Sequence, residues 1–140
     1  MQYDLIVVGS GAAGYSAAIY ASRYNINTLV IGKDTGGMAA TAHKIDNYPG
    51  IKSISGLELM QKFADHTKSF GVEIKQETIK AIKKQLDGSL EIITDKTQYQ
   101  TKTIILALGT ERRKINVPGE MKLLGKGVSY CATCDAMFFK

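Results

Sequence analysis

Close to its N-terminus the 140-residue chain reads Leu5-Ile6-Val7-Val8-Gly9-Ser10-Gly11-Ala12-Ala13-Gly14. Four consecutive apolar residues are typical of a buried parallel strand, and three glycines follow at the spacing Gly-x-Gly-x-x-Gly. In this spacing the first glycine permits a tight turn, the second lets the backbone approach a pyrophosphate, and the third lets a helix lie close to the strand. The free N–H groups at the start of that helix favour phosphate binding. The run therefore predicts a dinucleotide-binding loop.

The residues after this loop complete a βαβ unit. Residues 12–24 are rich in alanine and predict a closely packed helix, and residues 28–31 predict the second strand. At the end of that strand Gly32 replaces the acidic residue that usually binds the ribose, and Lys33 and Asp34 follow it. Lys33 would suit the 2′-phosphate of NADP, whereas Asp34 in a flexed loop could reach a ribose. The spacing alone leaves the identity of the dinucleotide open.

The rest of the chain predicts further strands and helices of an α/β fold. A long irregular stretch over 32–55 precedes an amphipathic helix over 57–70, which Gly71 ends. Strands are expected at 72–74, 78–82 and 90–93, with an Asp87-Gly88 hairpin turn and a continuation at Tyr99 and Thr101, so they form a small antiparallel meander. A fully apolar strand is expected over 103–108, and residues 112–119 resemble a linker.

Composition limits the classes of function. Apolar residues make up 44% of the chain and charged residues 22%, which is ordinary for a soluble globular protein. No apolar run approaches the roughly 20 residues that cross a bilayer, and the N-terminus does not resemble a secretory signal, so we expect a cytoplasmic protein without membrane contact. The densest basic run, Arg112-Arg113-Lys114, has no interleaved aromatic residues, and nucleic acid is not an expected partner.

The chain has two cysteines, and they stand together as Cys131-Ala132-Thr133-Cys134-Asp135. Such a pair can close a small disulfide ring, and in a cytosolic protein it is more often redox-active than structural. Asp135 could donate or accept the accompanying proton. A zinc site would need His43 and His66, whose spacing fits poorly, so no metal is expected. In a thioredoxin-type fold the pair would follow the first strand of its own βαβ unit, and it does not.

Over nearly its whole length the sequence resembles the low-molecular-weight thioredoxin reductases of bacteria and archaea, which are flavoprotein disulfide reductases. The most specific matching segment is Val128–Asp135. The other matching segments, in chain order, are Gly9–Gly14, Gly36-Gly37, Asn47-Tyr48-Pro49-Gly50, Ala107-Leu108-Gly109-Thr110 and Val117-Pro118-Gly119-Glu120. The sequence departs from the family at Met38, where glutamine is usual, and at Leu108 and Thr110, which modify an Ala-Thr-Gly pattern.

The resemblance implies FAD on the glycine loop, NADPH on a separate domain, and thioredoxin or a similar small dithiol protein as the partner. It implies that Cys134 faces the flavin, that Cys131 attacks the thioredoxin disulfide, and that Asp135 is the proton donor. Asn47 and the Gly37-Met38 loop would lie near the isoalloxazine ring. The expected cofactor-binding residues are Gly9, Ser10, Gly11, Ala12, Ala13, Gly14, Gly32, Lys33, Asp34, Gly36, Gly37, Met38, Asn47, Ala107 and Gly109.

By this resemblance residues 1–114 are the N-terminal segment of an α/β, Rossmann-like three-layer ββα FAD-binding domain, incomplete at its C-terminal end. Residues 115–140 are expected to be a linker and the start of an NADPH-binding domain that carries the cysteine pair. The chain is thus expected to be the N-terminal part of a reductase, homodimeric at full length, and unable by itself to take a hydride from NADPH. One alternative is a reductase that serves another carrier. The other is a non-catalytic FAD- or NADP-binding module in which the cysteines only staple the chain.

Overall fold

The structure is a computed structural model that describes residues 2–136, without the side chains of Thr133 and Cys134. The chain divides into two compact units, Met1–Gly109 and Thr110–Lys140. The first unit contains the whole β-sheet and its long helices. The second contains two short helical turns, α3 (Glu120–Leu123) and α4 (Ala132–Asp135).

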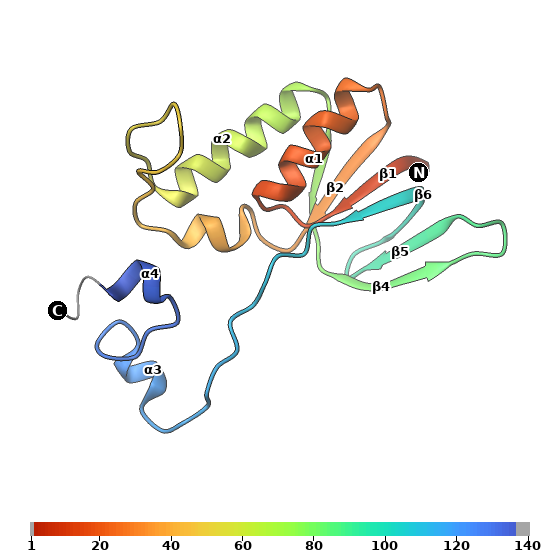
Figure 1. Cartoon of the computed structure of the whole chain (residues 1–140). Coiled ribbons are helices and arrows are strands. Elements are labelled where there is room, and N and C mark those ends of the chain that lie inside the picture. The colour runs from red at the N-terminus through yellow and green to blue at the C-terminus, as the bar shows by residue number, and fades with distance from the viewer. Residues whose placement is uncertain (1, 137–140) are drawn as a thin grey trace. The chain divides into compact units, whose positions relative to one another are not determined.

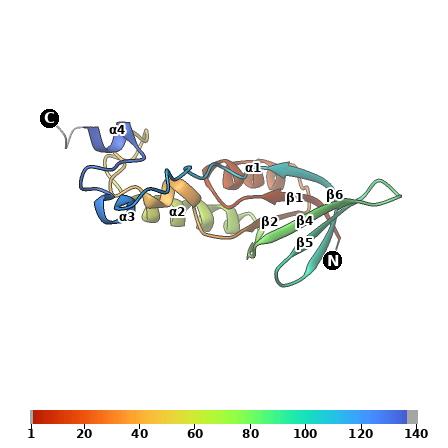
Figure 2. The same ribbon diagram turned by 90° about the horizontal axis from the view of Figure 1, so that it is seen from below.

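A six-stranded mixed sheet forms the centre of the first unit, in the order β3-β2-β1-β6-β5-β4 (Figures 1 and 2). Its strands are β1 (Gln2–Val8), β2 (Thr28–Gly32), β3 (Glu73–Gln76), β4 (Ile79–Lys84), β5 (Leu90–Thr94) and β6 (Gln98–Leu106). The pairs β3-β2, β2-β1 and β1-β6 are parallel, whereas β6-β5 and β5-β4 are antiparallel. Strands β1 and β2 belong to the predicted βαβ unit, and β4, β5 and the first part of β6 form the predicted meander. Strand β3, which was expected with the meander, instead pairs in parallel with β2.

Two helices lie together on one side of this sheet (Figure 1). Helix α1 (Ala12–Arg23) follows the glycine loop, and α2 (Gly56–Ser69) begins at Ser55, whose Oγ accepts a hydrogen bond from the Glu58 N–H. Gly71 follows α2 with a φ of 79°, as expected for the residue that ends a helix. The irregular stretch before α2 contains one short 3₁₀ helix, η1 (Gly37–Thr41), that the sequence did not predict. Within residues 2–136 no helix is long and apolar enough to span a membrane.

Successive side chains of β1 and β2 point to opposite faces of the sheet, and each face has its own hydrophobic core. Leu5, Val7 and Val30 face the helices, together with the buried residues Tyr15, Ala18, Ala21, Ala64 and Val72. Ile6, Val8, Leu29 and Ile31 face the other way and contact Ile92 of β5 and Tyr3 and Tyr99. Because the meander covers the face opposite the helices, the layers are helix, parallel sheet and meander. This confirms the predicted three-layer α/β fold.

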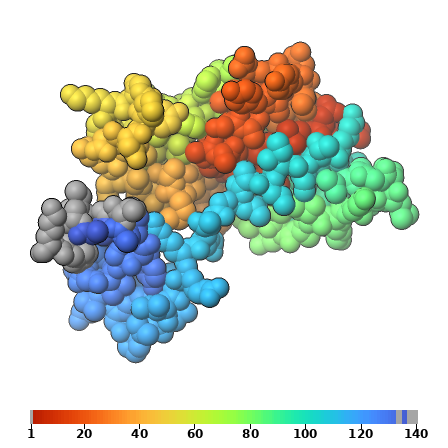
Figure 3. Space-filling model, viewed as in Figure 1, coloured from red at the N-terminus to blue at the C-terminus, as the bar shows by residue number. Residues whose placement is uncertain are grey.

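Strand β6 differs from its prediction. The sequence predicted a meander segment at Tyr99 and Thr101 and a separate apolar strand over 103–108, but one continuous strand covers Gln98–Leu106. Residues 98–101 pair with β5, Gln100 and Thr101 pair with β1 as well, and the residues from Thr103 onward pair with β1. Apolar side chains at its end are also exposed: Leu106 is 58% exposed, and atoms of this segment, in cyan, lie at the surface in Figure 3.

Candidate functional site

The glycine loop connects β1 to α1, and two of its glycines are required by the packing of the protein itself. Gly9 has a φ of 116°, and a Cβ there would lie 2.1 Å from the Ala107 carbonyl oxygen. A Cβ on Gly14 would lie 1.8 Å from the Gly9 carbonyl oxygen. Both distances are far below any real contact, so neither position can carry a side chain. These two glycines set the turn and the close approach of helix and strand, as predicted.

Gly11 is different, because no contact within the described residues requires a glycine there. Its φ is −94°, and a Cβ would meet only the Gly36 carbonyl oxygen, at 3.9 Å. Gly11 is also the N-cap of α1, and no side chain caps this end of the helix. The N–H groups in the first turn of a helix lack intrahelical partners. Open space at Gly11 beside an uncapped helix start therefore fits the pyrophosphate of a dinucleotide.

The segment after β2 lies directly against this loop. The Ser10 hydroxyl donates a hydrogen bond to the Asp34 carbonyl oxygen at 2.6 Å, and the Gly36 N–H donates to the Ser10 carbonyl oxygen at 2.7 Å. A Cβ on Gly32 would lie 2.0 Å from the Ser10 Oγ. An acidic residue at position 32 would thus collide with the loop, which explains why the usual ribose-binding side chain is missing there.

The structure brings most of the predicted cofactor residues of the first unit to this one place. Ala107 follows β6, and its N–H donates to the Val8 carbonyl oxygen at 2.8 Å; Gly109 follows with a φ of 67°. A Cβ on Gly37 would lie 4.0 Å from the Gly11 Cα. The remaining exposed side chains around the loop are those of Ala13, Lys33, Asp34 and Met38. Asn47 is exposed in the irregular stretch after η1, and its predicted place near a flavin stays a prediction.

The Tyr15 hydroxyl is a polar group that sequence reasoning missed. The side chain is fully buried in the core beneath the loop, and within the described chain its oxygen has no hydrogen-bond partner. Burial raises the pKa of this hydroxyl, and the nearby polar side chains of Thr35 and Ser10 act in the opposite direction. A buried hydroxyl without a partner costs about 1–3 kcal/mol. In the sequence, Tyr15 is indistinguishable from any other aromatic residue in a helix.

Replacing Tyr15 with phenylalanine is therefore expected to leave the free energy of unfolding unchanged or to raise it by up to about 1 kcal/mol. Tyr3→Phe is the matched control, because the Tyr3 hydroxyl donates to Glu73 Oε2 at 2.7 Å. That variant is expected to lose about 0.5–1.5 kcal/mol. Urea unfolding of the two variants and the unchanged chain, without added ligand, measures both effects. A clear loss of stability in Tyr15→Phe would show that the hydroxyl has a partner.

The predicted redox residues lie in the second unit. Cys131 is half-buried and disulfide-bonded, and the Cys134 side chain lies outside the described residues. The Ser129 hydroxyl donates to Asp135 Oδ2 at 2.6 Å, and the Ser129 Oγ accepts a hydrogen bond from the Cys131 N–H at 3.0 Å. The Asp135 N–H donates to the Cys131 carbonyl oxygen at 3.0 Å. Asp135 is thus linked to Cys131 both directly and through Ser129.

A second polar pair fixes the segment just before Cys131. The Tyr130 hydroxyl donates to the Glu120 carboxylate and accepts a hydrogen bond from the Ile115 N–H at 3.1 Å. Glu120 is buried, yet the hydrogen bond from Tyr130 lowers the pKa of its carboxyl group and raises the pKa of Tyr130. Glu120 stands in a motif that matched the family, but nothing in the sequence pairs it with Tyr130.

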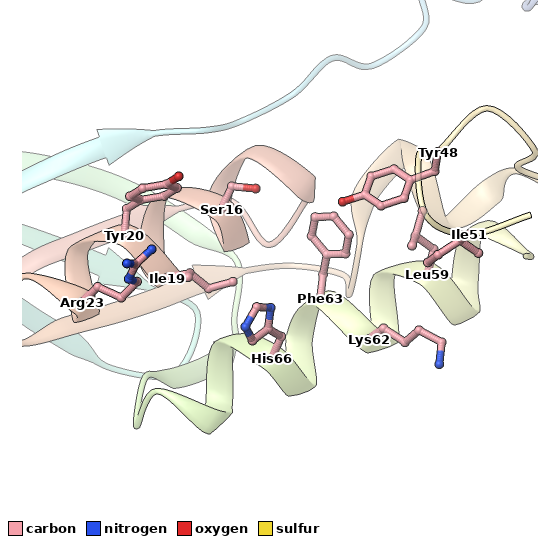
Figure 4. A pocket seen from close by; sticks show the side chains of 10 residues that line it. All are labelled: Ser16, Ile19, Tyr20, Arg23, Tyr48, Ile51, Leu59, Lys62, Phe63 and His66. Carbon is pink, nitrogen blue, oxygen red and sulfur yellow. The ribbon is translucent and has the colours of Figure 1, made fainter.

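A cavity of about 410 Å³ lies between the outer faces of α1 and α2 and the loop at Tyr48 (Figure 4). Tyr48 and Phe63 meet edge to face there, with ring centroids 5.9 Å apart. None of the predicted site residues lines it. In residues 2–136 no group of three or more histidine, cysteine, aspartate or glutamate residues could hold a metal ion.

The family profile described as "Pyridine nucleotide-disulphide oxidoreductase" matches residues 3–140. The thioredoxin reductase of Bacillus subtilis (strain 168) is 44% identical over 99% of this chain, and that of Treponema pallidum (strain Nichols) is 46% identical over 99%. The crystal structure of the thioredoxin reductase from Streptococcus pyogenes MGAS5005 superimposes with a TM-score of 0.83 at 38% identity, over 98% of this chain.

The matches cover only part of each relative. The aligned region is 44% of the Bacillus subtilis protein, 45% of the Treponema pallidum protein and 45% of the Streptococcus pyogenes chain. The chain therefore spans a little under half the length of these relatives.

Proposed function

The chain belongs to the pyridine nucleotide-disulphide oxidoreductase family, and we propose that it carries the FAD-binding loop and the reactive disulfide of a thioredoxin-disulfide reductase. In this proposal electrons pass from NADPH through FAD to the Cys131/Cys134 pair and then to thioredoxin or a similar small dithiol protein. NADPH binds a separate domain of the whole enzyme. The enzyme acts in the cytoplasm as a homodimer.

The observation that supports FAD most directly is the open backbone at Gly11. Gly9 and Gly14 are needed for packing, but Gly11 faces space in front of the uncapped start of α1. The first-turn N–H groups would hold the pyrophosphate, and the segment 32–37 would bind the adenosine side of the dinucleotide. The relatives, which are named thioredoxin reductases, favour FAD over NADP on this loop.

The chemistry proposed for the second unit is thiol–disulfide exchange. FAD, when bound, supplies a carrier of two electrons that can reduce a disulfide. The Cys131 thiolate attacks one sulfur of the partner's disulfide, that S–S bond breaks, and the leaving sulfur takes a proton from Asp135. Cys134 then attacks the mixed disulfide, which releases the partner's second sulfur and restores the Cys131–Cys134 disulfide. The protein dithiol is oxidised by two electrons and the partner is reduced by two.

The absorbance spectrum of the FAD-loaded protein tests this proposal. One equivalent of a dithiol should reduce the cysteine pair and add a long-wavelength band to the flavin spectrum, because reduction would give a thiolate that can interact with the bound flavin. The Cys134→Ser variant, loaded in the same way, should show no such change. A flavin spectrum that dithiol leaves untouched in the unchanged protein would instead indicate a binding module in which the cysteines only staple the chain.

A further inference from the structure

The segment that leads into Cys131 is held on its N-terminal side by a closed turn. The Val128 N–H donates to the Leu123 carbonyl oxygen at 3.0 Å, and the Gly125 N–H donates to the Val128 carbonyl oxygen at 2.9 Å. Ser129 follows this turn directly, and Tyr130 is tied to Glu120 and Ile115. The backbone of Ser129 is therefore fixed from both sides, and its side chain has a defined place from which to act.

Ser129 uses its hydroxyl in both directions. It donates its one proton to Asp135 Oδ2 at 2.6 Å, and its oxygen accepts the Cys131 N–H at 3.0 Å. The bond from the Ser129 hydroxyl to Oδ2 fixes the direction of the carboxyl group, so the proton that Asp135 donates is carried on its other oxygen, Oδ1. With the Asp135 N–H on the Cys131 carbonyl oxygen, a closed ring of three hydrogen bonds joins these residues.

We infer that Ser129 is a positioning residue that fixes the orientation of the Asp135 carboxyl group next to the backbone of Cys131. This inference rests on the proposed function, in which Asp135 gives its proton to the sulfur that leaves the partner's disulfide. Asp135 stands four residues after Cys131, and its side chain can rotate unless something holds it. The hydrogen bond from Ser129 to Asp135 Oδ2 restricts this rotation, so the carboxyl group keeps one orientation between turnovers. Proton transfer requires a donor within hydrogen-bond reach of its target. Loss of the Ser129–Asp135 hydrogen bond therefore slows only those exchanges in which the leaving sulfur needs a proton from Asp135.

Two small disulfide probes distinguish an effect on proton delivery from an effect on the other steps of the exchange, because their leaving thiolates differ in basicity. Bis(2-hydroxyethyl) disulfide has a strongly basic leaving thiolate, which needs a proton as it departs. The aromatic disulfide 5,5′-dithiobis(2-nitrobenzoate) has a weakly basic leaving thiolate, which does not. Each oxidises the dithiol-reduced chain by the same electron balance: the protein loses two electrons and two protons and forms its disulfide, and the probe becomes two thiols or thiolates.

The experiment measures the rate at which each probe oxidises the reduced full chain, followed by mass spectrometry of acid-quenched samples. Ser129→Ala is expected to react about tenfold more slowly with bis(2-hydroxyethyl) disulfide and within about twofold of the unchanged chain with the aromatic probe, since general acid catalysis supplies about 10²–10⁴. Ser129→Thr, which keeps a hydroxyl, should restore most of the rate. Adding Ser129→Ala to Asp135→Asn should cause no further loss, because Ser129 acts through Asp135.

Tyr130→Phe is the matched control for a general loosening of the segment, because it breaks the contacts to Glu120 and Ile115 and leaves the Ser129 hydroxyl in place. It should slow both probes equally or not at all. Equal slowing of both probes by Ser129→Ala, or no slowing, would overturn the positioning role while leaving the redox pair intact. If neither probe forms the internal disulfide in the unchanged chain, the proposed function itself fails.

Discussion

Substituting Gly11 with alanine is expected to weaken FAD binding by at least about 100-fold, or about 2.7 kcal/mol, while the fold stays intact. The φ of Gly11 suits alanine, and the added Cβ meets only one protein atom, at 3.9 Å. The methyl group would instead fill the space in which the pyrophosphate has to approach the backbone. Titration of flavin fluorescence measures the affinity, and urea unfolding measures the stability, which should change by no more than about 1 kcal/mol.

Gly14→Ala is the matched comparison, three residues further along the same loop. Its Cβ would lie 1.8 Å from a backbone oxygen, so helix and strand would have to separate. This variant should lose at least about 3 kcal/mol of stability together with FAD binding. A Gly11→Ala protein that binds FAD as tightly as the unchanged chain would remove Gly11 from the cofactor site.

The second large effect is expected at the cysteine pair. Mixed with a thioredoxin whose active-site thiol is activated as a thionitrobenzoate disulfide, Cys134→Ser should accumulate a covalent adduct. Cys131→Ser should form none, so its exchange rate should fall by several orders of magnitude. The reason is that Cys131 is proposed as the attacking sulfur, whereas Cys134 resolves the mixed disulfide. Non-reducing electrophoresis and the mass of the adduct provide the measurement.

Ala132→Ser controls for the added hydroxyl and should behave as the unchanged chain, which releases thioredoxin after a brief adduct. Adduct in Cys131→Ser but not in Cys134→Ser would reverse the two roles. Adduct in neither variant would mean that the pair does not react with thioredoxin at all.

The parallel half of the fold could be predicted because its local signals agree with one another. Gly9 and Gly14 carry requirements that follow from spacing alone, and the structure shows the two close contacts behind them. Helix α2 was predicted over 57–70 from its apolar stripe and is found at Gly56–Ser69. In each case the residue pattern depends on neighbours that are close in the sequence.

Strand β6 was divided wrongly because its surroundings change along its length. Residues 98–101 pair with β5, also with β1 from Gln100, and alternate between exposed and buried, whereas from Thr103 the strand becomes a continuous apolar run beside β1. A change of period in the middle of a strand looks like two strands. Only the pairing of the sheet shows that the chain continues without a break.

In the site, too, features set by residues close in the sequence could be predicted, whereas contacts between residues distant in the sequence could not. Gly32 was interpreted as a missing acidic residue, and the positive reason for it, the Ser10 side chain, lies 22 positions earlier in the sequence. Glu120 and Tyr130 belong to an irregular segment in which spacing carries no information about contact. The hydrogen bond from Ser129 to Asp135 crosses a turn that no periodic pattern describes. These partners depend on the folded path of the chain.

The open end of β6 also affects how this polypeptide behaves at high concentration. In the described chain, the backbone beyond Thr101 has a neighbouring strand on one side, and Ile105, Leu106 and Leu108 are exposed beside it. An unprotected edge of this kind can recruit the same edge of another molecule and start precipitation. Keeping the samples dilute, or introducing the substitution Leu106→Lys, should therefore keep the purified polypeptide monodisperse.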